Sequence, residues 1–475
     1  MTKIIPDSGS FRDPSGVVYR MNDDHDSNKI RIVRGINKDT YNQHIELLDN
    51  EIFKNFVSEG KIVGTKIIDL DEEICKELYP AKWHSFLEHQ AIDLISYPYE
   101  WSFSQLKDAA ILHLELLLEF LESGWIIKDS TPYNIQFVNN KPVFIDTPSI
   151  IKWEEGSGWD AYRQFCTLFL YPLMLENHLD IDYRALLKSN LDGIEPNFMY
   201  KVLGLRKLFK RGVLSHVFLP HSVEKRILVK EKNKTEAQNR TNIRQSKLSV
   251  IAIVDSMLGI IKKMNSKSSI SAWADYDHIN TYEKNDNNIK NDFIEKVCSN
   301  NNFNVAWDLG ANTGMFSEHI SKYVNHVVAI DGDPIAVDKM YSRLKKKDTN
   351  IHPLILNIQN MSPNHGFDSS ERIKLENRSK PDLVMCLAVI HHIRIAANIP
   401  CENFLNYLRN MNTDVIIEFV NRNDEMVEKL LLNKKEKYLD YNIENFIKFA
   451  NTIFTTEETI ELKGGKRVLF HLSPK

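Results

Sequence analysis

Cysteine is scarce in this sequence, and long apolar runs are absent from it. The five cysteines are scattered, odd in number and free of the spacing that marks a metal site; they are Cys75, Cys166, Cys298, Cys386 and Cys401. This usage excludes a disulfide framework and fits a reducing compartment. No apolar run approaches the ~20 residues that a membrane span requires, and the first residues lack the apolar core of a signal peptide. We therefore expect a cytoplasmic protein without a membrane span.

An excess of charge of one sign is also missing. The formal net charge is −4, and the basic and acidic residues are interleaved along the chain. Without a basic face, and without the Asn-Pro-Pro-Tyr type of motif used in base methylation, a nucleic-acid partner is not expected.

The length of 475 residues allows two or three domains, each with its own core. Residues 230–247 are polar, charged and almost without apolar side chains, which predicts a linker. A helical apolar period then resumes over residues 248–264. We therefore expect a first domain at 1–229, the linker at 230–247, a helical segment that covers the last domain at 248–300, and that last domain at 301–475.

The most informative stretch is residues 305–314, Val-Ala-Trp-Asp-Leu-Gly-Ala-Asn-Thr-Gly, followed at 327–331 by Val-Val-Ala-Ile-Asp. The pattern predicts a buried strand, a glycine-containing turn, a helix start and a second strand that ends in a carboxylate. This order of elements binds nucleotide-like cofactors at the edge of a parallel sheet. The alternative interpretation is an ordinary βαβ unit with a glycine turn, which has no cofactor site.

Asp308 decides between the possible cofactors. A dinucleotide site must bind an anionic pyrophosphate and favours backbone N–H groups over a carboxylate. S-adenosylmethionine (SAM) carries an ammonium and a sulfonium, which an acidic residue attracts. Gly310 and Gly314 let the backbone approach the methionine part, with Asn312 in the same turn. Asp331 is placed to accept both ribose hydroxyls.

Three further segments complete the pattern of this half. Residues 381–390 form an apolar run of the buried, parallel-strand type and end in His391 and His392. Residues 415–420 predict another strand that carries Glu418, and residues 459–472 predict an antiparallel hairpin with Gly464 and Gly465 in its turn. From residue 305 onward the sequence resembles a class I SAM-dependent methyltransferase. The resemblance implies a Rossmann-like, mostly parallel α/β sheet with a terminal antiparallel hairpin.

The resemblance also implies roles for single residues. Asn357, near the end of the third strand, and Leu387 stand where many of these enzymes contact the adenine. An oxygen or nitrogen nucleophile must lose a proton, and we expect His391 or His392 to accept it, although both can instead be structural. Glu418 is a candidate to orient a histidine or a substrate hydroxyl, with Asp424 a weaker one. Trp273, Tyr276, Tyr282 and Lys290 are candidate lid residues; core packing is the alternative for the aromatic ones.

A second constellation lies in the first 230 residues. Residues 105–122 have apolar side chains at helical spacing and predict a buried helix. Asp129 follows, with Asn134 five residues on and Asp146 at the end of a short predicted strand. This spacing resembles the catalytic and metal loops of protein kinases and aminoglycoside-type phosphotransferases. The resemblance implies an α+β kinase-like domain in which Asp129 orients a hydroxyl, while Asn134 and Asp146 hold Mg²⁺ under ATP.

This region also departs from the kinase pattern. Lys128 stands where kinases carry an arginine, the glycine-rich loop is incomplete, and Asp146 is followed by Thr-Pro. The lysine of the third strand is missing unless Arg34 takes its place, and arginine is not a simple substitute. An active phosphotransferase, a kinase-like binding domain and a chance spacing therefore all stay open.

Together the halves resemble bacterial two-part proteins in which a kinase-like region precedes a class I methyltransferase. Residues 95–110, 128–137, 143–146 and 161–165 carry this resemblance, along with the methyltransferase core. Some such proteins are similar to nodulation-type proteins tied to glycan modification. The favoured function is methyl transfer from SAM to an oxygen or nitrogen of a small-molecule or glycan acceptor. The alternatives are a bifunctional protein that also phosphorylates a hydroxyl with ATP and Mg²⁺, and a non-catalytic SAM-binding scaffold.

Overall fold

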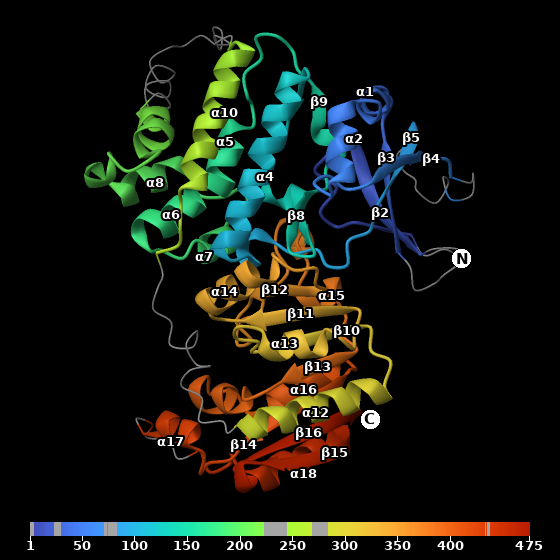
Figure 1. The fold of residues 1–475 in the computed structure, drawn as a ribbon, viewed down its shortest axis with the longest axis vertical. Coiled ribbons are helices and arrows are strands. Elements are labelled where there is room, and N and C mark those ends of the chain that lie inside the picture. The colour runs from blue at the N-terminus through green and yellow to red at the C-terminus, as the bar shows by residue number, and fades with distance from the viewer. Residues whose placement is uncertain are drawn as a thin grey trace. The chain divides into compact units, whose positions relative to one another are not determined.

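The chain forms two compact units (Figure 1). The computed structural model describes residues 4–22, 30–70, 74, 83–222, 245–267, 284–432, 434 and 438–475. The first unit comprises Met1–Ser268 and Asn364–Arg372, and the second comprises Ser269–Pro363 and Ile373–Lys475. Most of the predicted linker, and the predicted lid residues Trp273, Tyr276 and Tyr282, lie outside the described residues.

The first unit begins with a five-stranded antiparallel sheet in the order β1-β2-β3-β5-β4. Its strands are β1 (Ile4–Pro6), β2 (Gly16–Asn22), β3 (Ile30–Ile36), β4 (Thr65–Ile68) and β5 (Ser85–His89). Helices α1 (Lys38–Leu48) and α2 (Glu51–Ser58) lie between β3 and β4 in sequence, and each starts at an asparagine whose side chain accepts a backbone N–H.

The predicted helix over residues 105–122 is α4 (Phe103–Glu122), which starts at a Ser102–Gln105 capping box. After it come four short strands, β6 (Trp125–Ile127), β7 (Ile135–Val138), β8 (Lys141–Phe144) and β9 (Ile150–Lys152). They form two antiparallel pairs, β6 with β9 and β7 with β8. Asp129 therefore follows β6, Asn134 precedes β7, and Asp146 follows β8.

Helical segments fill the rest of this unit. They are η1 (Pro98–Glu100), η2 (Pro132–Asn134), η3 (Thr147–Ser149), α5 (Tyr162–Phe165), η4 (Cys166–Leu170), α6 (Tyr171–Leu179), α7 (Arg184–Ser189), α8 (Pro196–Leu203), η5 (Leu205–Lys207), η6 (Leu214–Phe218) and α10 (Lys247–Lys262). The apolar period of α10 predicts a helix that covers the methyltransferase, but the structure places α10 in the first unit against α4. Its apolar stripe, which includes Val250, Val254 and Ile261, is buried there.

The second unit is built on a seven-stranded sheet in the order β12-β11-β10-β13-β14-β16-β15. The strands are β10 (Val305–Leu309), β11 (His326–Asp331), β12 (Ile351–Ile355), β13 (Leu383–Cys386), β14 (Asp414–Val420), β15 (Phe454–Leu462) and β16 (Arg467–Pro474). The first five strands in this order are parallel, and the β15–β16 hairpin pairs antiparallel with β14. The predicted class I methyltransferase fold, with its terminal hairpin, is therefore confirmed for this unit.

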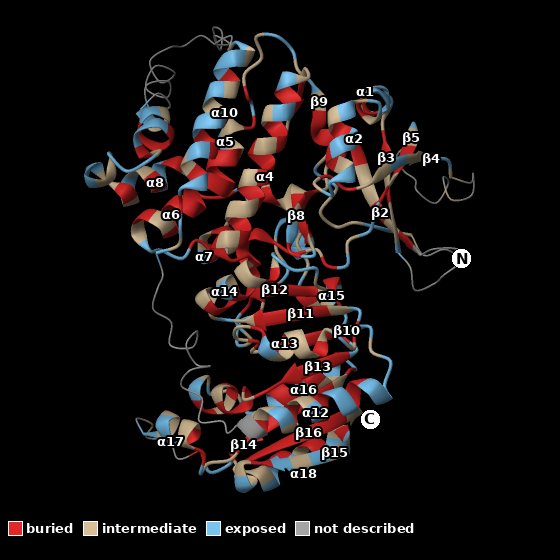
Figure 2. Ribbon diagram, viewed as in Figure 1, coloured by how far each residue is buried: buried red, intermediate tan, exposed pale blue. Residues whose placement is uncertain are grey.

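Helices accompany this sheet: α12 (Lys284–Asn300), α13 (Met315–Ile320), α14 (Pro334–Leu344), η7 (Phe367–Ser369, in the hairpin assigned to the first unit), α15 (Leu375–Arg378), η8 (His392–Ala396), α16 (Cys401–Asn410), α17 (Glu425–Leu431), α18 (Ile443–Ile453) and η9 (Lys463–Gly465). Figure 2 shows the parallel strands β10–β14 largely buried, as the parallel sheets of such folds require, whereas the edge strand β15 alternates between exposed and at least partly buried residues. One core cluster joins Ala306 of β10 to α12, α13 and α14. The next residue, Trp307, is also buried and donates from Nε1 to Ser379 Oγ at 3.2 Å, just after α15.

The order of strands fixes where a ligand can lie. The strand order reverses between β10 and β13, and the carboxyl ends of parallel strands form the ligand-binding edge of such sheets. Among the described helices, none is both long and apolar enough to cross a bilayer.

Candidate cofactor and active site

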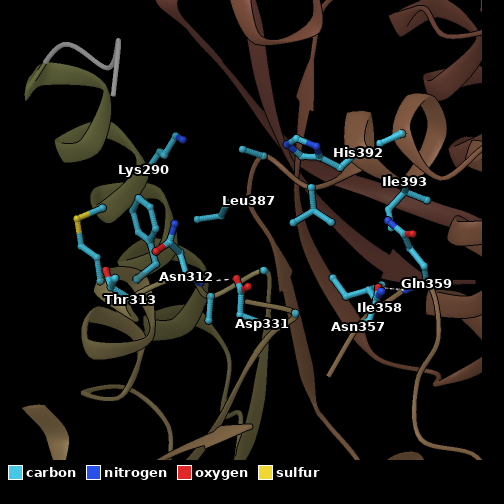
Figure 3. A pocket seen from close by; sticks show the side chains of 18 of the residues that line it. Lys290, Asn312, Thr313, Asp331, Asn357, Ile358, Gln359, Leu387, His392 and Ile393 are labelled. Atoms are coloured by element: carbon cyan, nitrogen blue, oxygen red, sulfur yellow. Dashed lines mark hydrogen bonds between the residues drawn. The ribbon is translucent and has the colours of Figure 1, made fainter. Parts of the chain in front are cut away.

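A cavity of about 430 Å³ opens at the carboxyl edge of β10, β11, β12 and β13. Six of the predicted cofactor-binding and catalytic residues line it, together with the predicted lid residue Lys290; the six are Gly310, Asn312, Asp331, Asn357, Leu387 and His392. In Figure 3, Lys290 and Thr313 lie on one side of Asp331, and Gln359 and Ile393 lie on the other. The structure thus brings to one cavity six residues that span 82 positions of the sequence, from Gly310 to His392.

The turn after β10 is fixed to the end of β11. The N–H groups of Gly310 and Ala311 donate to the carbonyl of Ile330 at 2.8 and 2.9 Å. Gly310 has a φ of +82°, and a Cβ added there would lie 2.5 Å from Val389 Cγ2. A side chain is therefore excluded at Gly310 by both backbone conformation and space.

Asp331 closes this turn from the other side. Its Oδ2 accepts the N–H of Asn312 at 2.7 Å and its Oδ1 accepts the N–H of Asp333 at 2.8 Å. Burial raises the pKa of Asp331, while these backbone N–H groups act in the opposite direction. Each oxygen keeps acceptor capacity after one backbone bond, so the carboxylate can accept two ligand hydroxyls.

Asp308 and Gly314 lie behind the turn and do not line the cavity. Asp308 is buried and accepts a hydrogen bond from Ser317 Oγ at 2.6 Å, which ties α13 to β10. Burial raises the pKa of Asp308 to about 7. Gly314, with a φ of +86°, is the N-cap residue of α13, and a Cβ there would lie 2.6 Å from Met340 Sδ. Both residues therefore support the conformation of the turn without lining the cavity.

The opposite wall comes from two short segments. Asn357 Oδ1 accepts the N–H of Gln359 at 2.9 Å, and Asn357 pairs with Asn360 in a tight turn. Leu387 is followed by Ala388, whose φ of +53° is unusual for a residue with a side chain. Strained backbone of this kind is often found at ligand sites.

The two histidines differ in position. His392 lines the cavity, whereas His391 lies behind it with 1% exposure, and neither ring nitrogen of His391 has a hydrogen-bond partner among the described residues. Their ring centroids are 4.1 Å apart. Burial lowers the pKa of His392 to about 4 and that of His391 well below its usual 6.5. Both imidazoles are therefore neutral near neutral pH.

Glu418 is a member of a buried charge network. Its two oxygens accept Lys290 Nζ at 2.8 Å and Arg467 Nη1 at 3.3 Å, and Arg467 also pairs with Asp424 at 2.8 Å. Burial raises the pKa of Glu418, but the charges of Lys290 and Arg467 outweigh burial, so the pKa is lowered. Burial also lowers the pKa of Lys290. Of this network, only Lys290 lines the cavity.

Of the three polar residues predicted in the first unit, Asp146 is the one that the other two, Asp129 and Asn134, interact with. Asn134 Nδ2 donates to Asp146 Oδ2 at 3.2 Å, and Arg34 Nη1 of β3 donates to Asp146 Oδ1 at 2.5 Å. Burial raises the pKa of Asp129, and the negative charge of Asp146 adds to that rise. Within the described residues, no three His, Cys, Asp or Glu side chains converge as a metal site.

Comparison with known proteins identifies the family. No protein-family model matches the chain. The nodulation protein NoeA of Rhizobium meliloti strain 1021 is 30% identical over 466 residues, which cover 98% of this chain and 95% of NoeA. The chain belongs to the NoeA family.

The solved structures similar to this NoeA-family chain include methyltransferases. The N-methyltransferase NodS of Bradyrhizobium japonicum WM9 is 12% identical, with a TM-score of 0.30, over 41% of this chain and 99% of NodS. A SAM-dependent methyltransferase of Clostridium acetobutylicum ATCC 824 is 13% identical, with a TM-score of 0.31, over 42% of this chain and 95% of that one.

Motif reasoning about the NoeA-family chain missed the partners of Glu418. The signal was present, because a glutamate inside an apolar strand requires a partner when that strand is buried. Identifying Arg467 required the position of β16 beside β14, where Val420 faces Arg467. Asn287 and Phe316, which also line the cavity, carry no motif.

Proposed function

We propose that this NoeA-family chain is a SAM-dependent methyltransferase that methylates an oxygen or nitrogen of a small-molecule or glycan acceptor. The observation that carries the proposal is the cavity built by the glycine turn after β10 and the carboxylate at the end of β11. It lies at the edge where sheets of this kind bind their ligands.

The residues of the cavity suit the chemical groups of SAM. Asp331 offers acceptor positions for two ribose hydroxyls, and the absence of a side chain at Gly310 leaves room for a ligand against the turn. The apolar side chain of Leu387 and the polar turn at Asn357 suit an adenine, which has an apolar face and a polar edge. When bound, SAM supplies an electrophilic methyl group, and the residues contribute alignment with the nucleophile.

His392 is the candidate proton acceptor. It lines the cavity, and its low pKa keeps the imidazole in the neutral form that can accept a proton. A base with a pKa of about 4 is weak, so His392 suits a nucleophile that loses its proton only as the new bond to the methyl forms.

A glycan is the acceptor class that we favour. NoeA is a nodulation protein, and the sequence resembles nodulation-type proteins, a resemblance that implies glycan modification. An oligosaccharide offers many hydroxyls, and an amino sugar adds a nitrogen nucleophile.

Cofactor binding is the first test. Titration of S-adenosylhomocysteine into the full chain should show saturable binding that Asp331→Ala removes. The matched control is Asp292→Ala, on the exposed face of α12 in the same unit, which should bind as the wild type does. Equal binding by the wild type and Asp331→Ala would mean that the cavity is not the cofactor site.

Methyl transfer is the second test. Labelled SAM is incubated with N-acetylglucosamine oligomers and with their deacetylated forms, which differ only in whether an amine is free. Transfer that His392→Ala slows at unchanged cofactor affinity supports His392 as the base; full turnover in that variant contradicts it. Cofactor binding without transfer to any acceptor would favour the scaffold alternative.

A phosphotransferase in the first unit is a second candidate, favoured by the Asn134–Asp146 hydrogen bond beside Asp129. The pairs β6–β9 and β7–β8 place all three residues in the segments next to strand ends, which suits a kinase-like domain. The Arg34–Asp146 ion pair opposes this function, because Asp146 already has a cation. Binding of ATP with Mg²⁺ to the full chain, lost in Asp146→Ala but kept in the exposed control Asp160→Ala, would support the candidate.

A further inference from the structure

A hairpin within the methyltransferase half of the sequence belongs to the first unit. Asn364–Arg372 lies between β12 and α15 along the chain, yet it is part of the unit formed by the N-terminal residues. His365 and Arg372 close it with two backbone hydrogen bonds, of 2.8 and 3.0 Å. The hairpin is thus a defined element and not an open loop.

An ion pair anchors the hairpin at Glu371. Arg12 donates from Nε and Nη2 to the two oxygens of Glu371 at 2.7 and 2.9 Å. Glu371 is only 3% exposed, while Arg12 is 60% exposed. Two-point pairing of this kind fixes direction as well as distance. Because Glu371 is buried, removal of its cation leaves a poorly compensated charge.

Aromatic side chains hold the other side of the hairpin. The Arg372 guanidinium lies 4.3 Å from the centre of the Tyr133 ring, and His365 lies 5.6 Å from Tyr99. Phe367 contacts Phe11 at 6.0 Å between ring centres. An arginine over an aromatic face is favourable and more so when little water is present. Tyr133 directly precedes Asn134, so the hairpin contacts the polar loop of the first unit.

Short connections link the hairpin to the cofactor cavity. Asn357, Ile358 and Gln359 line the cavity, and the turn closed by Asn360 leaves only residues 361–363 before the hairpin. After the hairpin, Ile373 is fixed to α15, because its carbonyl accepts a hydrogen bond from Arg378 Nε at 2.9 Å. A chain of so few residues spans at most ~3.6 Å per residue, so there is little slack to absorb a shift.

We propose that docking of Asn364–Arg372 on the first unit positions the Asn357–Gln359 wall for the cofactor. Arg12, Glu371 and Arg372 are then positioning residues, which act on a ligand that they do not touch. The first unit thereby tunes the SAM affinity of the second. This inference rests on the proposed function only in that SAM occupies the cavity.

The test measures affinity for S-adenosylhomocysteine in the full chain by calorimetry. Arg12→Ala and Arg372→Ala should each weaken binding by about five-fold or more, the lower range of coupling between sites. Arg12→Lys, which keeps a cation, should recover part of the loss. The matched control is Arg163→Ala, from the exposed Arg163–Glu195 pair of the same unit, which should bind as the wild type does.

The outcomes separate the two proposals. If the wild type binds S-adenosylhomocysteine and both Arg12→Ala and Arg372→Ala bind it with the same affinity, the hairpin proposal is overturned. The methyltransferase proposal then still stands. Absence of binding in the wild type overturns the methyltransferase proposal and this one with it. Linkage gives a second readout: saturating S-adenosylhomocysteine should slow amide hydrogen exchange in residues 365–372. Exchange that is the same with and without the ligand also contradicts the proposal.

Discussion

Gly310 offers a sharp test of the turn after β10. In Gly310→Ala the new methyl group meets Val389 Cγ2 at 2.5 Å, and the φ of +82° costs an L residue roughly 1–2 kcal/mol. Both effects displace the turn, so we expect affinity for S-adenosylhomocysteine to fall by about ten-fold or more, since ~1.4 kcal/mol is a factor of ten. Calorimetric titration of the folded variant measures this.

Gly464→Ala is the matched control for that substitution. Gly464 also has a positive φ, of +60°, but apart from its chain neighbours no atom of the described residues lies within 4 Å of an added Cβ. This variant in the same unit should therefore show the backbone strain without loss of affinity. If both variants bind equally well, the close approach at Gly310 does not matter to the ligand.

Residues within one motif could be placed from the sequence, whereas residues outside it could not. Gly310 and Asp331 were expected together because a strand, a turn and a second strand place them at one edge. The choice between His391 and His392 required the local path of the chain after β13, which a pair of adjacent histidines does not reveal. The Arg34–Asp146 pair depends on a separation of 112 positions, and no local pattern encodes it.

The charge network links three elements, and Glu418 is its centre. Glu418→Gln keeps the shape of the side chain but leaves Lys290 of α12 and Arg467 of β16 without a full counter-charge in a buried site. We expect the free energy of unfolding of the second unit to fall by about 3–5 kcal/mol. Urea unfolding monitored by circular dichroism measures the change.

Glu458→Gln provides the control for this prediction. Glu458 pairs with Lys296 of the same helix, α12, but both partners are partly exposed. An exposed pair contributes about 0–1 kcal/mol, so this variant should unfold almost as the wild type does. A loss of similar size in both variants would show that burial of Glu418 is not the cause.

Elements with a strong period were predictable, and their partners were not. The apolar runs predicted β10, β13 and β14, and Gly464 and Gly465 predicted the turn between β15 and β16. The apolar stripe of α10 predicted the helix, but the expectation that it covers the last domain was wrong, because a stripe of this kind can be buried by any apolar surface. In the structure, the apolar stripe of α10 packs against α4.

At the scale of the whole molecule, composition suggested a division that follows the order of the chain. The two compact units do not follow that order, because Asn364–Arg372 joins the first unit from within the second half. The ion pair at Arg12 joins residues 359 positions apart. Neither composition nor periodicity reports such a contact, because both describe short windows of sequence.

Buried histidines in both units predict how stability responds to acid. Burial lowers the pKa of His113 in the first unit and of His352 in the second to about 3, from an ordinary value of 6.5. The unfolded chain binds these protons first as the pH falls. The stability that the neutral histidines contribute is therefore complete above about pH 6.5 and is lost progressively from there toward pH 3. Each adds a slope of up to about 1.4 kcal/mol per pH unit.

Unfolding of the wild type, His113→Gln and His352→Gln between about pH 7 and about pH 5 tests this. The wild type should lose stability across the whole interval below about pH 6.5. Each variant should be less stable overall, but its stability should fall less steeply with pH. Its unfolding takes up about one proton fewer than that of the wild type, because glutamine does not titrate. The slope matters more than the midpoint, since any substitution in a core lowers the midpoint. Slopes equal to that of the wild type would mean that these two histidines are protonated in the folded units or do not titrate on unfolding.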